Sequence, residues 1–439
     1  MKKWGTRGGH MILMVALLAS AGCSARTDGE SNNKTLDDTK PVTLSIVVQE
    51  AMSDADFNLM MAEPLKKKYP YITLNRIKID NTTKLEDLLA ANQVPDIVAY
   101  PQDMITYLSD LGLVNDMEAL NKTHHVDLKR FESAALDAFK MNGKVIALPY
   151  AQTFITLYVN HDIFDKFGVA HPKDGMTWDD AMTLAKKVTR LENGVQYKGL
   201  EPSRTSRLSR SLALPYFDPK TGKAVIASND AWKKVFLTTK AIYDIPGNAH
   251  TTGSLTTAGG SADQFYKNQT VAMIVSTNIM TMFDEAVYRS LNWDLVQTPS
   301  FPEAADLTRF MGSFALFVTK QSTHQDQAMK VIQTVISDEV QLEMARKTLR
   351  VSPLKNKELQ TQFGADIPHV KGKNTMALFK GKPIPWPSYM TEYDTDAANI
   401  TESIFYKDML MNGMDINTAL REMDEKINKM VEEKQKMKK

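Results

Sequence analysis

Polar and aromatic side chains follow two strands predicted near the start of this 439-residue chain. Glu50 comes soon after the β-branched run VTLSIVV, whereas the run PDIVAY ends in Tyr100 and is followed by Asp103. Helix-like segments separate the strands, and such alternation is typical of a parallel sheet. Ligands bind beyond the carboxyl ends of strands in these sheets, so the three side chains are candidates for a binding site.

The segment from Gly143 to Gly168 carries a second group of candidates. Pro149 cannot donate a hydrogen bond to a sheet and is expected to end a strand. Tyr150 and Gln152 would then project from a loop, where binding clefts often obtain their side chains.

Motifs of metal and catalytic sites are absent from the sequence, which has neither HExxH nor Gly-x-Ser-x-Gly and contains one cysteine. We therefore expect no metal and no cofactor. Acidic residues are numerous, however, and a glycosidase pair depends on their separation in space, which the sequence leaves open.

The N-terminal segment predicts export. Basic residues precede the apolar run MILMVALLASAGC, which has the length of a signal-peptide core and is too short to span a bilayer. Residues 1–22 are therefore expected to be a lipoprotein signal peptide, and the small residues before Cys23 suit a bacterial lipobox. A lipidated Cys23 would anchor the chain to the outer face of the bacterial cytoplasmic membrane; the alternative is ordinary secretion with a free thiol. The polar residues 23–40 are expected to form a disordered tether.

Net charge bears on the possible partners of the chain, and its length bears on the number of domains. Removal of residues 1–22 takes away three basic residues and no acid, which lowers the formal charge from +1 to −2. This near-neutral balance, without a basic stripe interleaved with aromatics, argues against a nucleic-acid partner. The roughly 400 remaining residues favour two domains over a single core.

A long ordered motif runs through the segment that begins at Gly143. Its residues are Gly143, Lys144, Leu148, Pro149, Tyr158, Asn160, Asp162, Phe164, Gly168, Pro172, Thr177, Trp178 and Asp179. The motif resembles the central signature of the extracellular solute-binding proteins of ABC importers, in the carbohydrate-binding branch similar to maltose-binding protein. The resemblance continues through FYKNQTVAM and extends from Val42 to Met430.

The resemblance implies a two-lobed α/β fold, the class II periplasmic-binding-protein fold. Each lobe is expected to hold a mostly parallel sheet flanked by helices, and strands that cross between the lobes form a hinge that closes on ligand. The expected lobes are residues 41–152 plus 312–352 and residues 153–311 plus 353–439.

The resemblance also implies positions for the site. In the family an aromatic residue at the end of the Pro-Asp-hydrophobic strand contacts the sugar, and Tyr100 occupies that position. Residues just after Ala-Met line the cleft, often through a tryptophan; here they include Ser276 and Asn278. The full set of expected ligand contacts is Glu50, Tyr100, Asp103, Tyr150, Gln152, Ser276, Asn278, Trp386 and Tyr389.

Two further stretches leave alternatives open. Arg204, Arg207 and Arg210 lie at helical spacing, which indicates either a solvated helix face or a patch that accepts an acidic sugar such as a uronate. Trp386 lies between two prolines and cannot occupy the interior of a helix or a central strand. Trp386 and Tyr389 are expected either to pack at the hinge or to stack on the apolar faces of sugar rings.

The function that the resemblance implies is capture of an oligosaccharide or sugar derivative for delivery to an ABC permease. The receptor is expected to be a monomer, held to the membrane through Cys23, that makes and breaks no bond. The alternatives are a secreted glycoside-active enzyme and a solute receptor that feeds a sensor kinase.

Overall fold

The computed structural model describes residues 39–49, 52–79, 83–250, 260–385, 387 and 391–437. Cys23, Glu50, Trp386 and Tyr389 lie outside these ranges, as do the expected signal peptide and nearly all of the expected tether. Residues from Lys40 onward form one compact unit. Within the ranges described, no helix is long and apolar enough to cross a membrane.

Three parallel strands begin the sheet, and they include the two strands predicted before Glu50 and up to Tyr100. β1 (Val42–Gln49) pairs with β2 (Ile72–Ile79) on one side and with β3 (Ile97–Pro101) on the other. Side chains of β1 alternate between two hydrophobic clusters, one on each face of the sheet. Burial on both faces explains why the strand is an almost continuous apolar run. We call the part of the molecule built on β1, β2 and β3 the first lobe.

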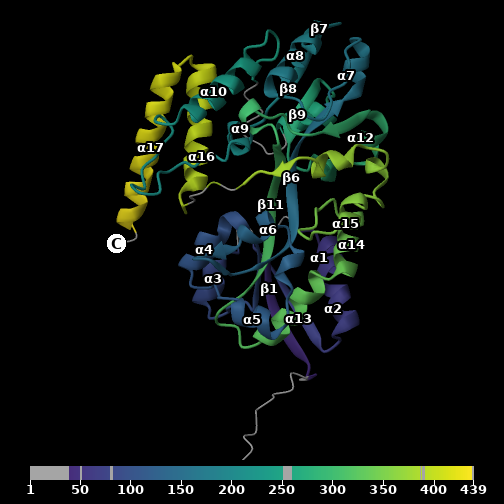
Figure 1. The fold of residues 1–439 in the computed structure, drawn as a ribbon, viewed down its shortest axis with the longest axis vertical. Helices are drawn as coiled ribbons and strands as arrows, with labels where there is room; N and C mark the ends of the chain where they lie inside the picture. Colours follow the sequence, from purple (N-terminus) through teal and green to yellow (C-terminus); the bar gives the residue numbers. More distant parts are fainter. Residues whose placement is uncertain are drawn as a thin grey trace, which may run out of the picture. The chain divides into compact units, whose positions relative to one another are not determined.

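Short helices cover the first lobe (Figure 1). They and its small hairpin are α1 (Asp54–Phe57), a π-helical turn (Asn58–Ala62), α2 (Glu63–Lys68), α3 (Leu85–Ala90), α4 (Ile105–Asp110), α5 (Glu118–Thr123), α6 (Ser133–Asp137), β4 (Lys140–Met141), β5 (Lys144–Val145), α13 (Gln325–Val335) and α14 (Asp338–Lys347). Residues 325–347 form two helices rather than one. Ser337 accepts a hydrogen bond from the backbone N–H of Val340 and so gives α14 its own N-terminus.

Two long strands, β6 (Leu148–Asn160) and β11 (Leu307–Val318), carry the sheet out of the first lobe (Figure 1). They pair antiparallel with each other. The first part of β6 packs in the core of the first lobe, whereas its last residues pair with β9 (Val271–Ser276) and β10 (Trp293–Val296). Both strands are therefore crossing strands of the kind that the resemblance implies.

The prediction that Pro149 ends a strand is wrong. β6 continues past Pro149 without a loop, so Tyr150 and Gln152 are strand residues. The pairing register shifts between Phe314 and Ala315, where Tyr150 is the extra residue of the bulge. A bulge is one of the few places where a sheet accepts proline, because the ladder is interrupted there.

The second lobe is built on β9, which pairs antiparallel with β6 and parallel with β8 (Val195–Glu201). β7 (Arg190–Glu192) completes this edge of the sheet. The other elements are α7 (His161–Lys166), α8 (Trp178–Val188), α9 (Thr205–Ser211), α10 (Asp230–Tyr243), α11 (Gly260–Tyr266), α12 (Glu285–Ser290), β12 (Lys382–Pro383), α16 (Asp394–Ser403), a π-helical turn (Ile404–Met411) and α17 (Ile416–Met437). The helix α15 (Lys357–Thr361) contacts α14, and its Leu359 packs in the core of the first lobe.

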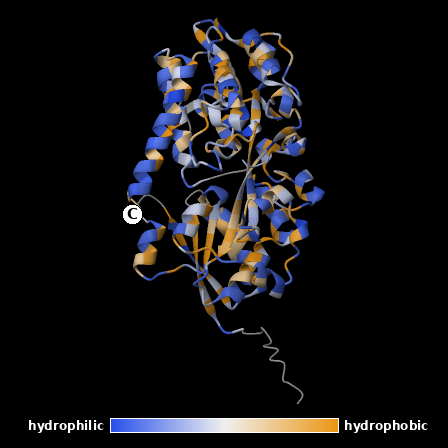
Figure 2. Cartoon of the chain, turned by 60° about the vertical axis from the view of Figure 1, so that its left-hand side comes forward, coloured by the Kyte–Doolittle hydropathy of each residue, from blue (hydrophilic) through white to orange (hydrophobic). Residues whose placement is uncertain are grey.

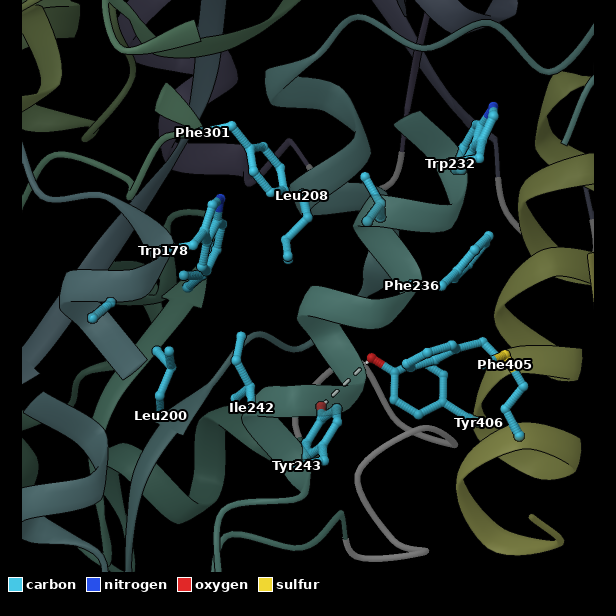
Figure 3. Packing of buried hydrophobic residues seen from close by; sticks show 14 of the residues in the cluster. Trp178, Leu200, Leu208, Trp232, Phe236, Ile242, Tyr243, Phe301, Phe405 and Tyr406 are labelled. Atoms are coloured by element: carbon cyan, nitrogen blue, oxygen red, sulfur yellow. Dashed lines mark hydrogen bonds between the residues drawn. The ribbon is translucent and has the colours of Figure 1, made fainter. Parts of the chain in front are cut away.

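Helices of the second lobe pack through large aromatic residues (Figure 3). Trp178 begins α8 and is 2% exposed, and a capping box of Thr177 and Asp180 starts that helix. Trp232 and Phe236 of α10 stack at 5.8 Å, and Phe405 joins them from near the C-terminus. Apolar residues follow the strands, whereas hydrophilic residues lie on the outer helix faces (Figure 2).

Candidate ligand-binding cleft

Two cavities lie on the crossing strands. The first has a volume of about 600 Å³ and the second of about 570 Å³. Thr153 of β6, Phe314 of β11 and Thr277, just after β9, line both. The other lining residues come from both lobes, so the two cavities form one cleft. We call the place where the cavities share Thr153, Thr277 and Phe314 the waist of the cleft.

Buried polar contacts of the crossing strands form the floor of the cleft. Gln152, which lines the first cavity, is 5% exposed, and its Nε2 donates to Oγ of Ser313 at 3.0 Å. The backbone N–H of Ser313 in turn donates to Oε1 of Gln102 at 3.0 Å. Gln102 and Ser313 line the second cavity, so one hydrogen-bonded row of residues connects the two cavities.

A third crossing segment closes the first cavity. Val351 bonds with the backbone of Gln152 in both directions, which places Arg350 in the cavity wall. The preceding residue, Leu349, has a left-handed backbone with φ of 55° and accepts a hydrogen bond from Nδ2 of Asn278 at 2.8 Å. The Oδ1 atom of Asn278 is buried and has no hydrogen-bond partner in the part of the chain described. Asn278 is thus a cleft residue with an unused acceptor.

Arginines dominate one wall of the second cavity. Arg204, Arg207 and Arg210 all line it, so they do not form a purely solvated helix face. Burial lowers the pKa of Arg207 and of Arg210 to about 10. Asp103 and Asp394 line the same cavity, and burial raises the pKa of both carboxyls while Arg210 opposes the rise. The wall therefore carries partly desolvated charges of both signs.

A buried network behind this wall positions the arginine segment. Glu402 of α16 accepts hydrogen bonds from the backbone N–H groups of Thr205 and Ser206 and so caps α9 from another helix. Tyr243 donates to Glu201 at 2.6 Å and lies 3.5 Å from the hydroxyl of Tyr406 (Figure 3). Because these groups come from distant parts of the chain, the sequence alone gives no sign that they support the cleft.

Three of the expected ligand contacts line the cleft. Gln152 and Asn278 lie in the first cavity and Asp103 in the second. Thr277, which lies between Ser276 and Asn278 in the chain, contributes to both.

The other expected contacts that the structure describes are buried away from both cavities. Tyr100 is 3% exposed and stacks on Tyr107, and Tyr150 is 2% exposed in the core of the first lobe. Burial raises the pKa of each phenol to about 12. Ser276 is 5% exposed and pairs with Thr156 inside the sheet. All three are strand residues, and the pleat turns their side chains into the protein.

Several cleft residues carry no recognisable sequence signal. In the sequence, Phe314 looks like any apolar residue of a strand. Asp56 looks like any acidic residue in the first turn of a helix. Tyr216 and Asp394 join the second cavity from segments that are far apart in the sequence. In the described residues, no group of three His, Cys, Asp or Glu side chains is arranged to hold a metal ion.

Comparisons with known proteins agree with this architecture. The arabinooligosaccharide-binding protein of Bacillus subtilis (strain 168) is 24% identical over 95% of this chain and 88% of its own. An ABC substrate-binding protein from Listeria monocytogenes, solved with cycloalternan, aligns with a TM-score of 0.71 at 19% identity over 89% of this chain and 99% of that one. A sugar transporter from Rhizobium etli in an open conformation aligns with a TM-score of 0.73 at 19% identity over 88% of this chain and 99% of that one.

These likenesses confirm the expected two-lobed class II fold. The profile of the family described as bacterial extracellular solute-binding protein matches residues 60–372, which is more than half of the chain. The match includes β6, β9, β11 and the third crossing segment, the elements that build the floor of the cleft. The chain therefore belongs to the bacterial extracellular solute-binding proteins.

Proposed function

We propose that this protein is the receptor of an ABC importer, captures a carbohydrate between its lobes and delivers it to the permease. The observation that carries the proposal is the cleft on the crossing strands, whose two cavities share Thr153, Thr277 and Phe314. A cleft walled by both lobes encloses its ligand when the lobes close. The names of the relatives, which bind arabinooligosaccharide or cycloalternan or transport sugar, support a carbohydrate as the ligand.

The lining suits a sugar because it combines hydrogen-bonding groups with aromatic faces. Gln152 and Asn278 bring amide groups to the wall of the first cavity, and Asp103 brings a carboxyl group to the wall of the second. Phe314 at the waist and Tyr216 in the second cavity provide apolar faces for sugar rings. Glu50, Trp386 and Tyr389 remain sequence-based members of the proposed site, whereas the burial of Tyr100, Tyr150 and Ser276 argues for structural roles.

We also propose how the chain is organised and held. The proposed lobes comprise 41–152 plus 312–352 and 153–311 plus 353–439. The hydrophobic clusters support this division for most of the chain, whereas Leu354 and Leu359 pack in the cluster of the first lobe. Lipid on Cys23 would anchor a monomeric receptor to the membrane through the tether. Membrane fractionation of the producing cell tests the anchor: the wild-type chain is expected in the membrane fraction and the Cys23→Ser variant in the soluble fraction.

A binding screen tests the function. The mature chain with Cys23→Ser is mixed with neutral and anionic mono- and oligosaccharides, and the shift in melting temperature is measured. A ligand that binds only the folded state raises that temperature, so at least one carbohydrate is expected to do so. Chromatography of the sugar after incubation is expected to show it unchanged. Release of a cleaved product, or no shift with any carbohydrate, would contradict the proposal.

A further inference from the structure

The second cavity contains an arginine for which local structure gives no reason. Arg204 is the residue that precedes α9, and its side chain makes no hydrogen bond to that helix. A cation at a helix N-terminus is unfavourable because the helix dipole is positive there, and arginine is a poor capping residue. The capping role is filled instead by Glu402, whose carboxylate accepts from the backbone N–H groups of Thr205 and Ser206.

The acids around the arginine segment are engaged with other groups. Glu201 accepts from the hydroxyl of Tyr243 at 2.6 Å and from the backbone N–H of Ser203 at 2.8 Å. Asp103 and Asp394 both lie close enough to Arg210 for its charge to lower their pKa values. Among the residues that the structure describes, the wall of the cavity therefore contains three arginines and only these two carboxylates.

The guanidinium groups of Arg204 and Arg207 differ in their hydrogen-bond partners. Arg207 donates to the backbone carbonyl of Val275 at the end of β9, which fixes its position. Arg204 is exposed and, among the described residues, has neither a side-chain hydrogen bond nor an ion pair. Burial is the main cause that lowers the pKa of Arg207, and the positive charge of Arg204 lowers that pKa further. Two like charges in the wall of a partly desolvated cavity favour a bound anion.

We infer that the second cavity binds an anionic group of the carbohydrate ligand, and that Arg204 sets this preference. The inference rests on the proposed function and deepens it. A uronate carboxylate and a sulfate ester share the required chemistry, because a guanidinium fork donates two parallel hydrogen bonds to either. The neutral part of the same ligand would extend past Phe314 into the first cavity, which holds Gln152 and Asn278.

Matched sugars test the inference by calorimetry on the mature chain with Cys23→Ser. The probes are a galacturonate trimer, the galactose trimer of the same linkage, and that neutral trimer carrying one sulfate ester. At least one anionic trimer is expected to bind roughly tenfold or more tightly than the neutral trimer, as a hydrogen bond to a charged group predicts. The anionic trimer that binds more tightly shows whether the preferred group is a carboxylate or a sulfate.

Two arginine variants complete the test. Arg204→Gln is expected to remove the preference for the anionic trimer and to leave the melting temperature unchanged. Arg190→Gln is the matched control, since Arg190 lies over the ring of Phe167 at 4.2 Å and lines neither cavity. Equal or tighter binding of the neutral trimer by the wild type, or an unchanged preference in Arg204→Gln, would overturn the inference while the proposed function stands. Failure of every carbohydrate in the wider screen would instead contradict the proposed function.

Discussion

Arg350 and Asp56 form an ion pair in the wall of the first cavity, with 2.9 Å between Nη2 and Oδ2. Their side chains are 18% and 23% exposed. Asp56 belongs to α1 of the first lobe, and Arg350 lies in the third crossing segment. The pair therefore ties the hinge region to one lobe at the edge of the cleft.

Removal of this pair is expected to destabilise the protein. Arg350→Gln leaves the half-buried carboxylate of Asp56 without its partner. The free energy of unfolding should fall by about 2 kcal/mol, between the values for exposed and fully buried pairs. Urea denaturation measures the change. The control is Lys67→Gln, whose pair with Glu339 is 77% and 75% exposed and should matter little. An equal loss in both variants would show that the partial burial is irrelevant.

Gln152→Leu is expected to weaken ligand binding. The variant keeps the volume of the side chain but removes the amide that reaches Ser313 and the first cavity. Loss of one hydrogen bond to the ligand should lower the affinity by roughly threefold to tenfold. Calorimetry with the sugar found in the binding screen measures this. Gln321→Leu serves as the control, because Gln321 bonds the carbonyl of Gly112 and lines neither cavity; a similar loss there would contradict the prediction.

Gly199→Ala is expected to be strongly destabilising. A Cβ at position 199 would lie 2.4 Å from the backbone oxygen of Ala185 in α8, so the helix could not keep its place against β8. Overpacking of this kind costs about 1–3 kcal/mol or more. The comparison variant is Gly222→Ala, which has φ of 66° and no atom within 4 Å of the added Cβ. Only the cost of a left-handed backbone for a residue with a Cβ, about 1–2 kcal/mol, applies there, so a smaller shift of the melting temperature is expected than for Gly199→Ala.

His250 is expected to make stability depend on pH. Burial, and then the positive charge of Lys198, lower the pKa of His250 to about 4. The unfolded chain takes up a proton near about pH 6.5, whereas the folded chain does not. The contribution of this neutral imidazole to stability is therefore present above about pH 6.5 and is lost as the pH falls toward 4.

The variant His250→Phe tests this contribution. A phenyl ring can keep the contact with Tyr406, whose ring centre lies 4.8 Å from that of His250, and cannot titrate. The urea midpoints of the wild type and of His250→Phe are measured at about pH 7 and at about pH 5. The wild type should lose more stability between the two than the variant does. An equal loss in both proteins would show that His250 does not titrate in this range on unfolding.

Local signals determined much of the secondary structure. The apolar run of β1 and the alternation of β2 gave the parallel start of the sheet, because periodicity reports burial directly. The amphipathic pattern of residues 230–243 is typical of a helix, and these residues form α10; Thr177, a residue type that favours helix N-termini, caps α8. The ordered motif after Gly143 predicted the family and the crossing strands, since many residue types had to agree at fixed spacing.

The tertiary structure decided which side chains reach the ligand. Tyr100 and Tyr150 have the chemistry of sugar contacts, yet strand pleat and a bulge turn them into the core, and local sequence does not report the facing of a strand buried on both sides. Arg204 is an ordinary surface arginine in the sequence. In the structure, Glu402 of α16 caps α9, so Arg204 has no capping role. Arg204 becomes a candidate for ligand specificity because it lines the second cavity of the cleft.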